Sequence, residues 1–375
     1  MDPPIEASPG RPPRVLVLTP EFAPYAWGGL ATYLHAVVPR LVTRGIRVDV
    51  VVAPTYARDT LRVDVDGLPL PLLVDPDADP EDQFAAVNAE WGERYDAAFV
   101  QDPQAAPLAA LLLSRSICRR VIATAHLPTY GGFSYFDKPE DDAQHQALEA
   151  MLFRLSHRVV APSAFAADVV LQVHRLDRSD VAVIPYGAPA LEPAARRRPA
   201  GAPLDVISVG RIAKQKGLED LCAIAGAVPA HVALFSHIGS ARKGGDDNLL
   251  QLLQQARISV LGHRDHREVL ARMLEADVVL STSMYETFGL ALLEGMAAGA
   301  VPVAFECGAF HEFMVSGECG VLVRPGDVAA VVDELHALHG DPARLCDLRR
   351  GAIATAQSFS WETHVAELSG VLLRG

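Results

Sequence analysis

The most informative stretch of this chain is STSMYETFGLALLEGM, residues 281–296. An apolar run ends at Leu280, a short polar loop follows, and a helical pattern begins at once with Leu290, Leu293 and Met296 on one face. The first amides of such a helix have no intrahelical partners and carry the positive end of the helix dipole, so they predict a phosphate site. Its residues are Thr287, Phe288, Gly289 and Leu290.

Two carboxylates bracket this loop, Glu286 within it and Glu294 further along the helix. Because a carboxylate repels an anion, we interpret both groups as acceptors for hydroxyl groups rather than as phosphate ligands. Phosphate and sugar hydroxyls together predict a nucleotide sugar as the ligand.

A cationic element follows another apolar run. The run Val206–Val209 ends in Gly210 and Arg211, and Lys214 and Lys216 come next. The chain has only four lysines, and two of them lie here, at the carboxyl end of a predicted strand, where ligands bind in open α/β sheets. Arg211 and Lys216 are therefore predicted to donate to a diphosphate and to stabilise it as a leaving group.

These elements resemble the retaining glycosyltransferases of family 4. The resemblance rests on the Gly-Arg-x4-Lys-Gly element after a strand, the Glu-x7-Glu pair, and an early Gly28-Gly29-Leu30. It covers nearly the whole chain, with the motifs in the family's order. It implies an α/β GT-B fold: two Rossmann-like domains whose parallel sheets face a central cleft. It further implies a hexosyltransferase (EC 2.4) that uses a nucleoside diphosphate sugar, UDP favoured, without a cofactor or metal.

The resemblance also implies individual roles. Glu286 holds hydroxyls of the donor sugar, Glu294 holds the ribose, and the segment around His263 meets the base. The Gly28 and Gly29 loop opens the first long helix, where glycine lets a backbone approach a phosphate or an acceptor closely.

His126 ends another apolar strand, in the segment Thr124–Leu127. It is similar to the family's cleft histidine, which contacts the donor sugar, and we predict it as catalytic together with Arg211, Lys216 and Glu286. Leu127 stands where many relatives have an aspartate, so the role of His126 is expected to be partial.

Composition excludes several classes of protein. The chain has 375 residues, 50% of them hydrophobic, and a net charge of −13, which argues against nucleic acid and anionic membranes as partners. The acidic, proline-rich start has no apolar core and predicts no signal peptide, and no apolar run is long enough to span a bilayer. We therefore expect a cytoplasmic protein. Its five cysteines form no Cys-x2-Cys pair and are predicted to be reduced thiols.

Short apolar runs alternate with helical patterns along the chain, which predicts doubly wound parallel sheets. The expected strands include Val15–Leu18, Val48–Val52, Val121–Ala123, Val206–Val209 and Val278–Leu280. The expected order is a disordered tail (1–13), an acceptor-binding domain (14–190), a linker (191–203), a nucleotide-sugar domain (204–357) and a final helix that crosses back (358–375).

Other interpretations remain open. Asp64-Val65-Asp66 and the segment Asp75–Asp79 match the Asp-x-Asp motif of metal-dependent transferases, but they lie in a polar, proline-broken segment that reads as a solvated loop. A UDP-sugar epimerase has the same architecture and can bind the same ligand. A third possibility is a nucleotide-sugar binding protein without catalysis.

The expected acceptor is a soluble small molecule or saccharide. Trp27 stands where starch and glycogen synthases usually have a small residue, which argues against glucan synthesis. The acidic run 137–142 follows the Gly131–Phe133 loop and would attract a cationic acceptor, such as an aminocyclitol in natural-product biosynthesis. The alternative is that this run only solubilises and caps the next helix.

Overall fold

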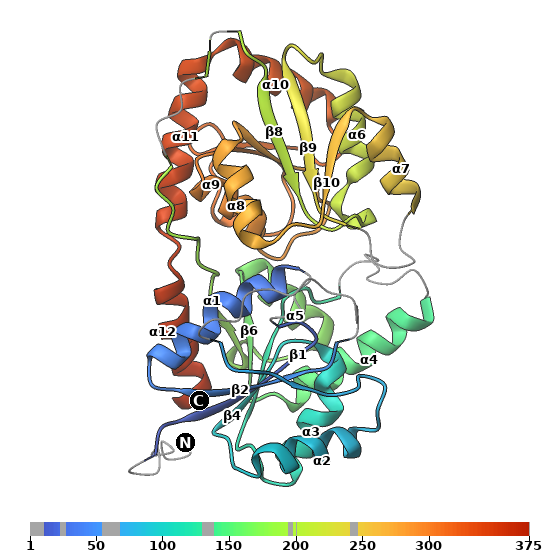
Figure 1. Ribbon diagram of the computed structural model, residues 1–375, viewed down its shortest axis with the longest axis vertical. Coiled ribbons are helices and arrows are strands. Elements are labelled where there is room, and N and C mark those ends of the chain that lie inside the picture. Colours follow the sequence, from blue (N-terminus) through green and yellow to red (C-terminus); the bar gives the residue numbers. More distant parts are fainter. Residues whose placement is uncertain are drawn as a thin grey trace. The chain divides into compact units, whose positions relative to one another are not determined.

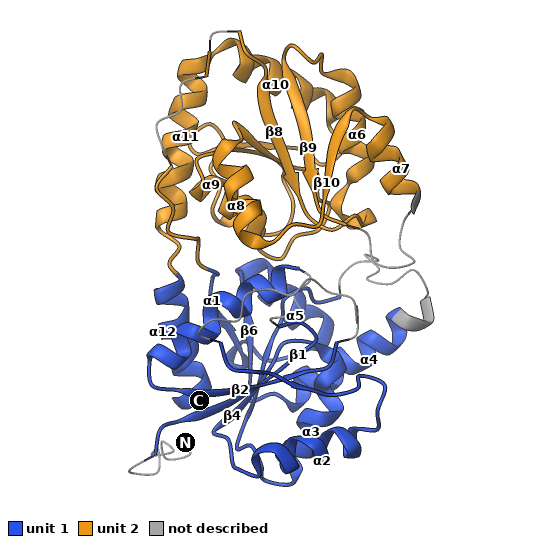
Figure 2. Cartoon of the chain, in the orientation of Figure 1, with its two compact units in different colours: residues 1–186, 361–375 blue, residues 187–360 orange. Residues whose placement is uncertain are grey.

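The computed structural model describes residues 11–22, 28–54, 68–129, 139–193, 198–199, 201–240 and 247–374, without the side chains of 139–141 and 247. The chain forms two compact units (Figure 2). Unit 1 comprises residues 1–186 and 361–375, and unit 2 comprises residues 187–360.

Unit 1 is built on a parallel sheet in the order β3-β2-β1-β4-β5-β6-β7 (Figure 1). Its central strands β1, β4 and β5 are rich in valine, leucine and alanine and are buried on both faces, as helix-covered strands of a parallel sheet must be. The strands are β1 (Arg14–Thr19), β2 (Arg47–Val52), β3 (Leu72–Leu73), β4 (Ala97–Val100), β5 (Val121–Thr124), β6 (Arg158–Ala161) and β7 (Val181–Val183).

Helices connect these strands, and the last helix of the chain joins them. Within unit 1, α12 packs against α1 and β4, far away in the sequence. Apolar residues repeat every three to four positions on both helices, for example Leu34, Val38 and Leu41 on α1. The helices are α1 (Gly29–Thr43), α2 (Pro80–Trp91), α3 (Ala106–Ser114), α4 (Pro139–Leu155), α5 (Ala164–His174) and α12 (Trp361–Arg374).

Unit 2 repeats the plan with a parallel sheet in the order β10-β9-β8-β11-β12-β13. Its strands are β8 (Leu204–Val209), β9 (Ala233–Ile238), β10 (Ile258–Gly262), β11 (Val278–Ser281), β12 (Val301–Phe305) and β13 (Val321–Val323). Its helices are α6 (Leu218–Ala227), α7 (Asp247–Gln255), α8 (His266–Glu275), α9 (Leu290–Ala297), α10 (Val328–Gly340) and α11 (Pro342–Gln357).

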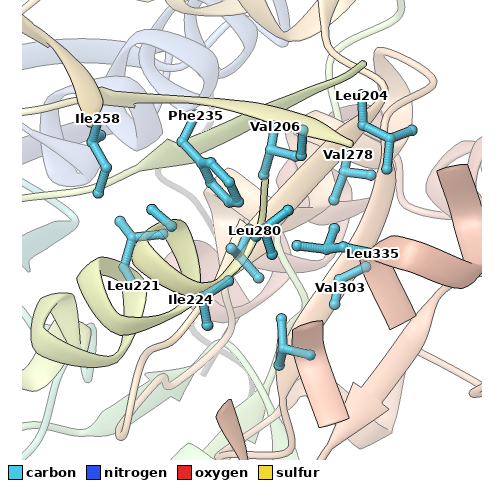
Figure 3. Close-up of a cluster of buried hydrophobic side chains, with 14 of the residues drawn as sticks. Leu204, Val206, Leu221, Ile224, Phe235, Ile258, Val278, Leu280, Val303 and Leu335 are labelled. Atoms are coloured by element: carbon cyan, nitrogen blue, oxygen red, sulfur yellow. The ribbon is translucent and has the colours of Figure 1, made fainter. Parts of the chain in front are cut away.

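One core cluster of unit 2 lies between this sheet and its helices (Figure 3). Val206, Val278 and Val303 come from three neighbouring strands and are almost fully buried. They form one cluster with Leu221 of α6 and Leu335 of α10. Burying each such side chain contributes about 1.5–3 kcal/mol, so this cluster holds the strand ends, and the loops that follow them, in fixed places.

The expected doubly wound, two-domain α/β fold is confirmed, and all the expected strands named above are present. The strand β3 was not predicted. Leu72–Leu73 has only two residues, directly after a proline, and so shows no periodicity. The chain passes between the units at 186/187 and 360/361. Residues 1–10 of the expected tail, and 194–197 and 200 of the expected linker, lie outside the described residues.

Candidate active site

The candidate donor site lies where the strand order of unit 2 reverses. The neighbouring strands β8 and β11 are parallel, and the sheet continues from β8 toward β9 and from β11 toward β12. Loops leaving the carboxyl ends of two such strands diverge to opposite faces, which creates the usual ligand position in an open α/β sheet. The two sequence elements singled out above are these two loops.

The two loops are bound to each other. Gly217 has a φ of +60°, and a Cβ there would lie 2.0 Å from the carbonyl oxygen of Thr282, so only glycine allows this approach. The Thr282 hydroxyl donates to the Lys216 carbonyl at 3.0 Å, and the Met284 amide donates to the Gln215 carbonyl at 2.9 Å. The β8 loop therefore has a fixed position relative to the β11 loop.

This connection brings two predicted site residues together. Lys216 Nζ donates to Glu286 Oε1 at 2.5 Å, and the Ser283 hydroxyl donates to the same oxygen at 2.9 Å. The side chains of Lys216 and Glu286 are 21% and 16% exposed, so the pair is largely screened from bulk water but still reachable. The carboxylate is held through one oxygen in a defined orientation, which suits it to accept a hydroxyl through the other.

The helix after this loop starts as the sequence predicted. Gly289 precedes Leu290 with a φ of +93°, and a Cβ there would lie 2.2 Å from the Phe310 ring. The Phe288 side chain is buried against Phe313 and Phe359, with ring centroids 5.6 and 5.9 Å away. Phe288 therefore anchors the loop through its ring, and its backbone, with that of Thr287, Gly289 and Leu290, surrounds the start of α9.

The second carboxylate of the pair is also held by a basic group. Glu294 on α9 is 5% exposed, and His266 Nε2 donates to its Oε1 at 2.7 Å. His263, in the loop between β10 and α8, is half-buried, and burial lowers its pKa although Asp265 opposes the shift. Gly210 and Arg211 follow β8 directly, both half-buried, and the Gly210 amide donates to the Ile238 carbonyl at 3.0 Å.

Sequence reasoning missed three side chains in this region: Ser283, His266 and His237. His237 lies on β9 opposite Ser208 of β8, is 1% exposed, and its Nδ1 lies 3.3 Å from the Ser208 hydroxyl. Burial lowers its pKa to about 4, the Gly210 backbone opposes this, and the charge of Lys216 adds to it. A histidine inside an apolar strand is the signal that could have identified it.

In unit 1, the early glycine loop lies beside a carboxylate. The Gly28 amide donates to Glu21 Oε2 at 2.9 Å, and Glu21 is itself buried after β1. Gly29 is the first residue of α1 and is exposed. Because a carboxylate repels phosphate, this arrangement favours hydroxyl groups over an anion at the start of α1.

His126 follows β5, and both of its ring nitrogens have partners. Nδ1 lies 2.6 Å from the Tyr186 hydroxyl and Nε2 lies 2.9 Å from Gln101 Oε1. Burial, with a smaller effect of His364, lowers the pKa of His126 to about 3, so the ring is neutral at physiological pH. The structure thus places His126 at a strand end, as predicted, but within a network of protein groups.

Helix α12 supplies part of that network. Trp361 stacks on Tyr186 at 6.1 Å between ring centroids, and His364 packs edge-on against Tyr33 at 5.4 Å. His364 Nδ1 lies 2.8 Å from the Pro185 carbonyl, and burial lowers its pKa to about 4. The surroundings of His126 are therefore aromatic and neutral.

The structure groups the predicted residues by unit. Gly210, Arg211, Lys216, His263, Glu286 and Glu294 belong to unit 2 with the start of α9, whereas Gly28, Gly29 and His126 belong to unit 1. Of the possible Asp-x-Asp segments, Asp75–Asp79 forms a turn in which Asp79 caps α2, and residues 64–66 lie outside the described part of the chain, as do Trp27 and 130–138.

The described ranges contain neither a metal-binding cluster nor a membrane-spanning helix. No group of three or more histidine, cysteine, aspartate or glutamate side chains there could hold a metal ion. No helix there is both long and apolar enough to cross a bilayer.

The chain is similar to known glycosyltransferases in both units. Residues 194–358 match the family described as glycosyl transferases group 1, and residues 27–190 match glycosyltransferase family 4. The glycogen synthase of Mycobacterium tuberculosis is 30% identical over 264 residues, which are 68% of this chain and 63% of that protein. The 2-deoxystreptamine N-acetyl-D-glucosaminyltransferase of Streptomyces fradiae is 29% identical over 273 residues, which are 66% of this chain and 62% of that protein.

Solved structures agree on the fold. Anabaena HepE, solved in complex with UDP-glucose, has a TM-score of 0.75 and 18% identity, covering 96% of this chain and 99% of that chain. The chain spans slightly less than two thirds of the length of the two relatives above. Because the two family matches together cover most of both units, the chain belongs to the group 1 glycosyltransferases of family 4, with the GT-B fold.

Proposed function

We propose that the protein transfers a hexose or N-acetylhexosamine from a nucleoside diphosphate sugar, with retention of anomeric configuration, to a hydroxyl of a small acceptor. The observation that carries this proposal is the Lys216–Glu286 pair beside the start of α9, at the strand reversal of unit 2. It combines a cation, helix amides and an oriented carboxylate, which a diphosphate and a sugar need together.

Breaking the anomeric bond places negative charge on the departing diphosphate. Lys216, Arg211 and the amides at the start of α9 would stabilise that charge without a metal, because their donors are already in place before the bond breaks. The ammonium of Lys216 has three donors, so it can keep its bond to Glu286 while it contacts a phosphate oxygen.

The two carboxylates would accept hydrogen bonds from hydroxyl groups of the donor. Glu286 would hold the donor sugar, because its oriented carboxylate lies next to the proposed diphosphate cation, and Glu294 would hold the ribose. We favour a UDP-sugar, which is the ligand that HepE carries in its solved complex. His263 would lie at the base.

The acceptor would bind to unit 1. We favour an aminocyclitol or a similar polyhydroxylated molecule, because the S. fradiae relative acts on 2-deoxystreptamine and because Glu21 offers a carboxylate beside Gly28. A glucan is the second candidate, since a glycogen synthase is among the relatives.

The experiment has two stages. Thermal shift with UDP, GDP, ADP and dTDP sugars identifies the donor, because only a bound ligand raises the melting temperature. The donor is then incubated alone, with 2-deoxystreptamine and with maltooligosaccharides, and the products are analysed by NMR for anomeric configuration. An α-linked product from an α-linked donor supports the proposal, whereas isomerisation of the sugar without acceptor indicates an epimerase.

A further inference from the structure

The two carboxylates of the Glu-x7-Glu pair are held in the same way. Lys216 binds one oxygen of Glu286, and His266 binds one oxygen of Glu294, at 2.5 and 2.7 Å. For neither glutamate does the described part of the chain offer a hydrogen bond to Oε2. Each carboxylate is thus fixed by a basic group from a different element and keeps a second acceptor oxygen.

The ring of His266 has a defined place. It is the first residue of α8, and the preceding Asp265 caps that helix by accepting from the Glu268 amide at 2.8 Å, while Glu268 accepts from the Asp265 amide. Helix α8 packs against α9, which carries Glu294. The His266–Glu294 contact therefore joins two helices whose ends are both fixed.

We propose that His266 is a positioning residue that orients Glu294 toward the ribose hydroxyls of the donor and makes ribose recognition weaken as pH rises. This rests on the proposed function, since it requires that Glu294 faces a ribonucleotide. A carboxylate that is free to rotate must be ordered on binding, and a held carboxylate has already lost that freedom.

The charges around His266 set the sign of the pH effect. Burial lowers the pKa of His266, but the hydrogen bond and charge of Glu294, with the charge of Asp265, outweigh burial and leave the pKa raised. Glu294 comes from α9 and Asp265 from the helix cap, and the neighbouring His263 has a lowered pKa and is neutral. His266 therefore keeps its positive charge to a higher pH than an ordinary histidine and loses that charge as the pH rises further.

The two holding groups differ in one respect. One is an ammonium and the other is an imidazole, and imidazole is the side chain whose ordinary pKa lies near neutral pH. Protonated His266 holds Glu294 by a charge-assisted hydrogen bond, whereas neutral His266 holds it by a weaker, uncharged hydrogen bond. Ribose recognition through Glu294 should thus weaken as the pH rises.

The probe is the pair UDP and 2′-deoxy-UDP, measured by isothermal titration calorimetry between pH 5.5 and 9. Both share the titrating phosphate and base, so the ratio of their dissociation constants isolates the ribose 2′-hydroxyl. If ADP or GDP binds in place of UDP, that nucleotide and its 2′-deoxy analogue are used. We expect the ratio to favour UDP about tenfold at low pH and to decline through the titration of His266.

Variants test the assignment. His266→Ala should lose most of the UDP preference at every pH, because Glu294 is no longer held. His266→Gln can still donate, so it should keep part of the preference but show no pH step. His231→Ala is the matched control, since His231 is exposed in the turn before β9 and should change nothing. Glu294→Gln should lose the UDP preference. Adding His266→Ala to the Glu294→Gln variant should then have no further effect.

The outcomes separate the two proposals. If wild-type protein binds none of the nucleotides, the proposed function is wrong. If it binds UDP but His266→Ala and His266→Gln keep the wild-type ratio and its pH dependence, the role of His266 is wrong and the proposed function stands. If circular dichroism shows that His266→Ala does not fold, the His266→Gln variant alone tests the role of His266.

Discussion

The two units place different groups at the carboxyl ends of their parallel strands. In unit 2 the loops after β8 and β11 carry a lysine–glutamate pair and a histidine–glutamate pair. In unit 1 the residues after β4 and β5, Gln101 and His126, lie in a network with Tyr186, and the residues of that network are neutral. The carboxyl edge of the sheet thus holds charged pairs in unit 2 and, around His126, neutral aromatic groups in unit 1.

Under the proposed function, this difference matches what each site would bind. A diphosphate would bring negative charge, so the charged groups in unit 2 would regain by contact with it what they lose in hydration. A group that binds a hydroxyl needs no such charge, which suits the neutral surroundings of His126. His126 and His364 are accordingly neutral, with pKa values lowered to about 3 and about 4, mainly by burial.

The largest expected effect tests the charged side of the comparison. Lys216→Ala and Glu286→Gln should each lower kcat by about 10²–10³-fold, because under the proposed function each removes a group that acts on the developing charge or on the sugar. The fold should persist, since neither side chain lies in the hydrophobic core. Steady-state kinetics and circular dichroism measure both.

Lys214→Ala is the matched control, because Lys214 is exposed two residues away. Near-wild-type turnover of either site variant would show that its assignment is wrong.

The free energy of unfolding of unit 1 should decrease in acid, because two of its buried histidines are neutral in the folded state. Because His126 and His364 have lowered pKa values in the folded protein, the unfolded chain binds more protons as pH falls below 6.5. The stability these groups contribute is complete above pH 6.5 and is lost between 6.5 and about 4. Each histidine should cost about 1.4 kcal/mol per pH unit in that range.

Urea unfolding at pH 7 and pH 5 measures this loss. All three tryptophans, Trp27, Trp91 and Trp361, belong to unit 1, so tryptophan fluorescence reports that unit. His364→Gln should reduce the pH dependence and the exposed His231→Gln should not. If His364→Gln and the wild-type protein lose equal stability between pH 7 and pH 5, His364 does not contribute to the pH dependence of stability.

A smaller effect concerns Tyr186. Tyr186→Phe removes the 2.6 Å contact with His126 but keeps the stack on Trp361. We expect kcat to fall about tenfold with the donor KM unchanged, because one hydrogen bond in unit 1 is lost and unit 2 is untouched.

Tyr95→Phe serves as the control for Tyr186→Phe. It also loses a buried hydroxyl contact in unit 1, at 3.1 Å to Asp49, but at the other end of the sheet. An equal loss of kcat in the two variants would mean that Tyr186 acts through general stability.

The smallest expected effect is that of chelation. If Lys216, Arg211 and the helix amides serve the diphosphate, transfer should continue at an unchanged rate in EDTA. Assays with and without EDTA, followed by added magnesium or manganese, measure this. Loss of activity that either metal restores would favour a metal-dependent mechanism.

Local pattern alone predicted much of this protein. Apolar runs of four to six residues separated by helical periods determined the alternating strands and helices, because burial on both faces of a parallel sheet leaves a continuous apolar signature. The Glu286 loop and the Lys216 loop were identifiable because each follows such a run and opens a helix. Family resemblance then supplied their proposed roles.

Tertiary structure alone decided which of these residues meet. Lys216 and Glu286 are 70 positions apart and pair because β8 and β11 are neighbours in the sheet, an order that no local period encodes. His266 reaches Glu294 because α8 packs on α9, and Trp361 reaches Tyr186 because α12 returns to unit 1. Sequence periodicity records which face of an element is buried, whereas strand order and helix packing determine which side chain lies opposite.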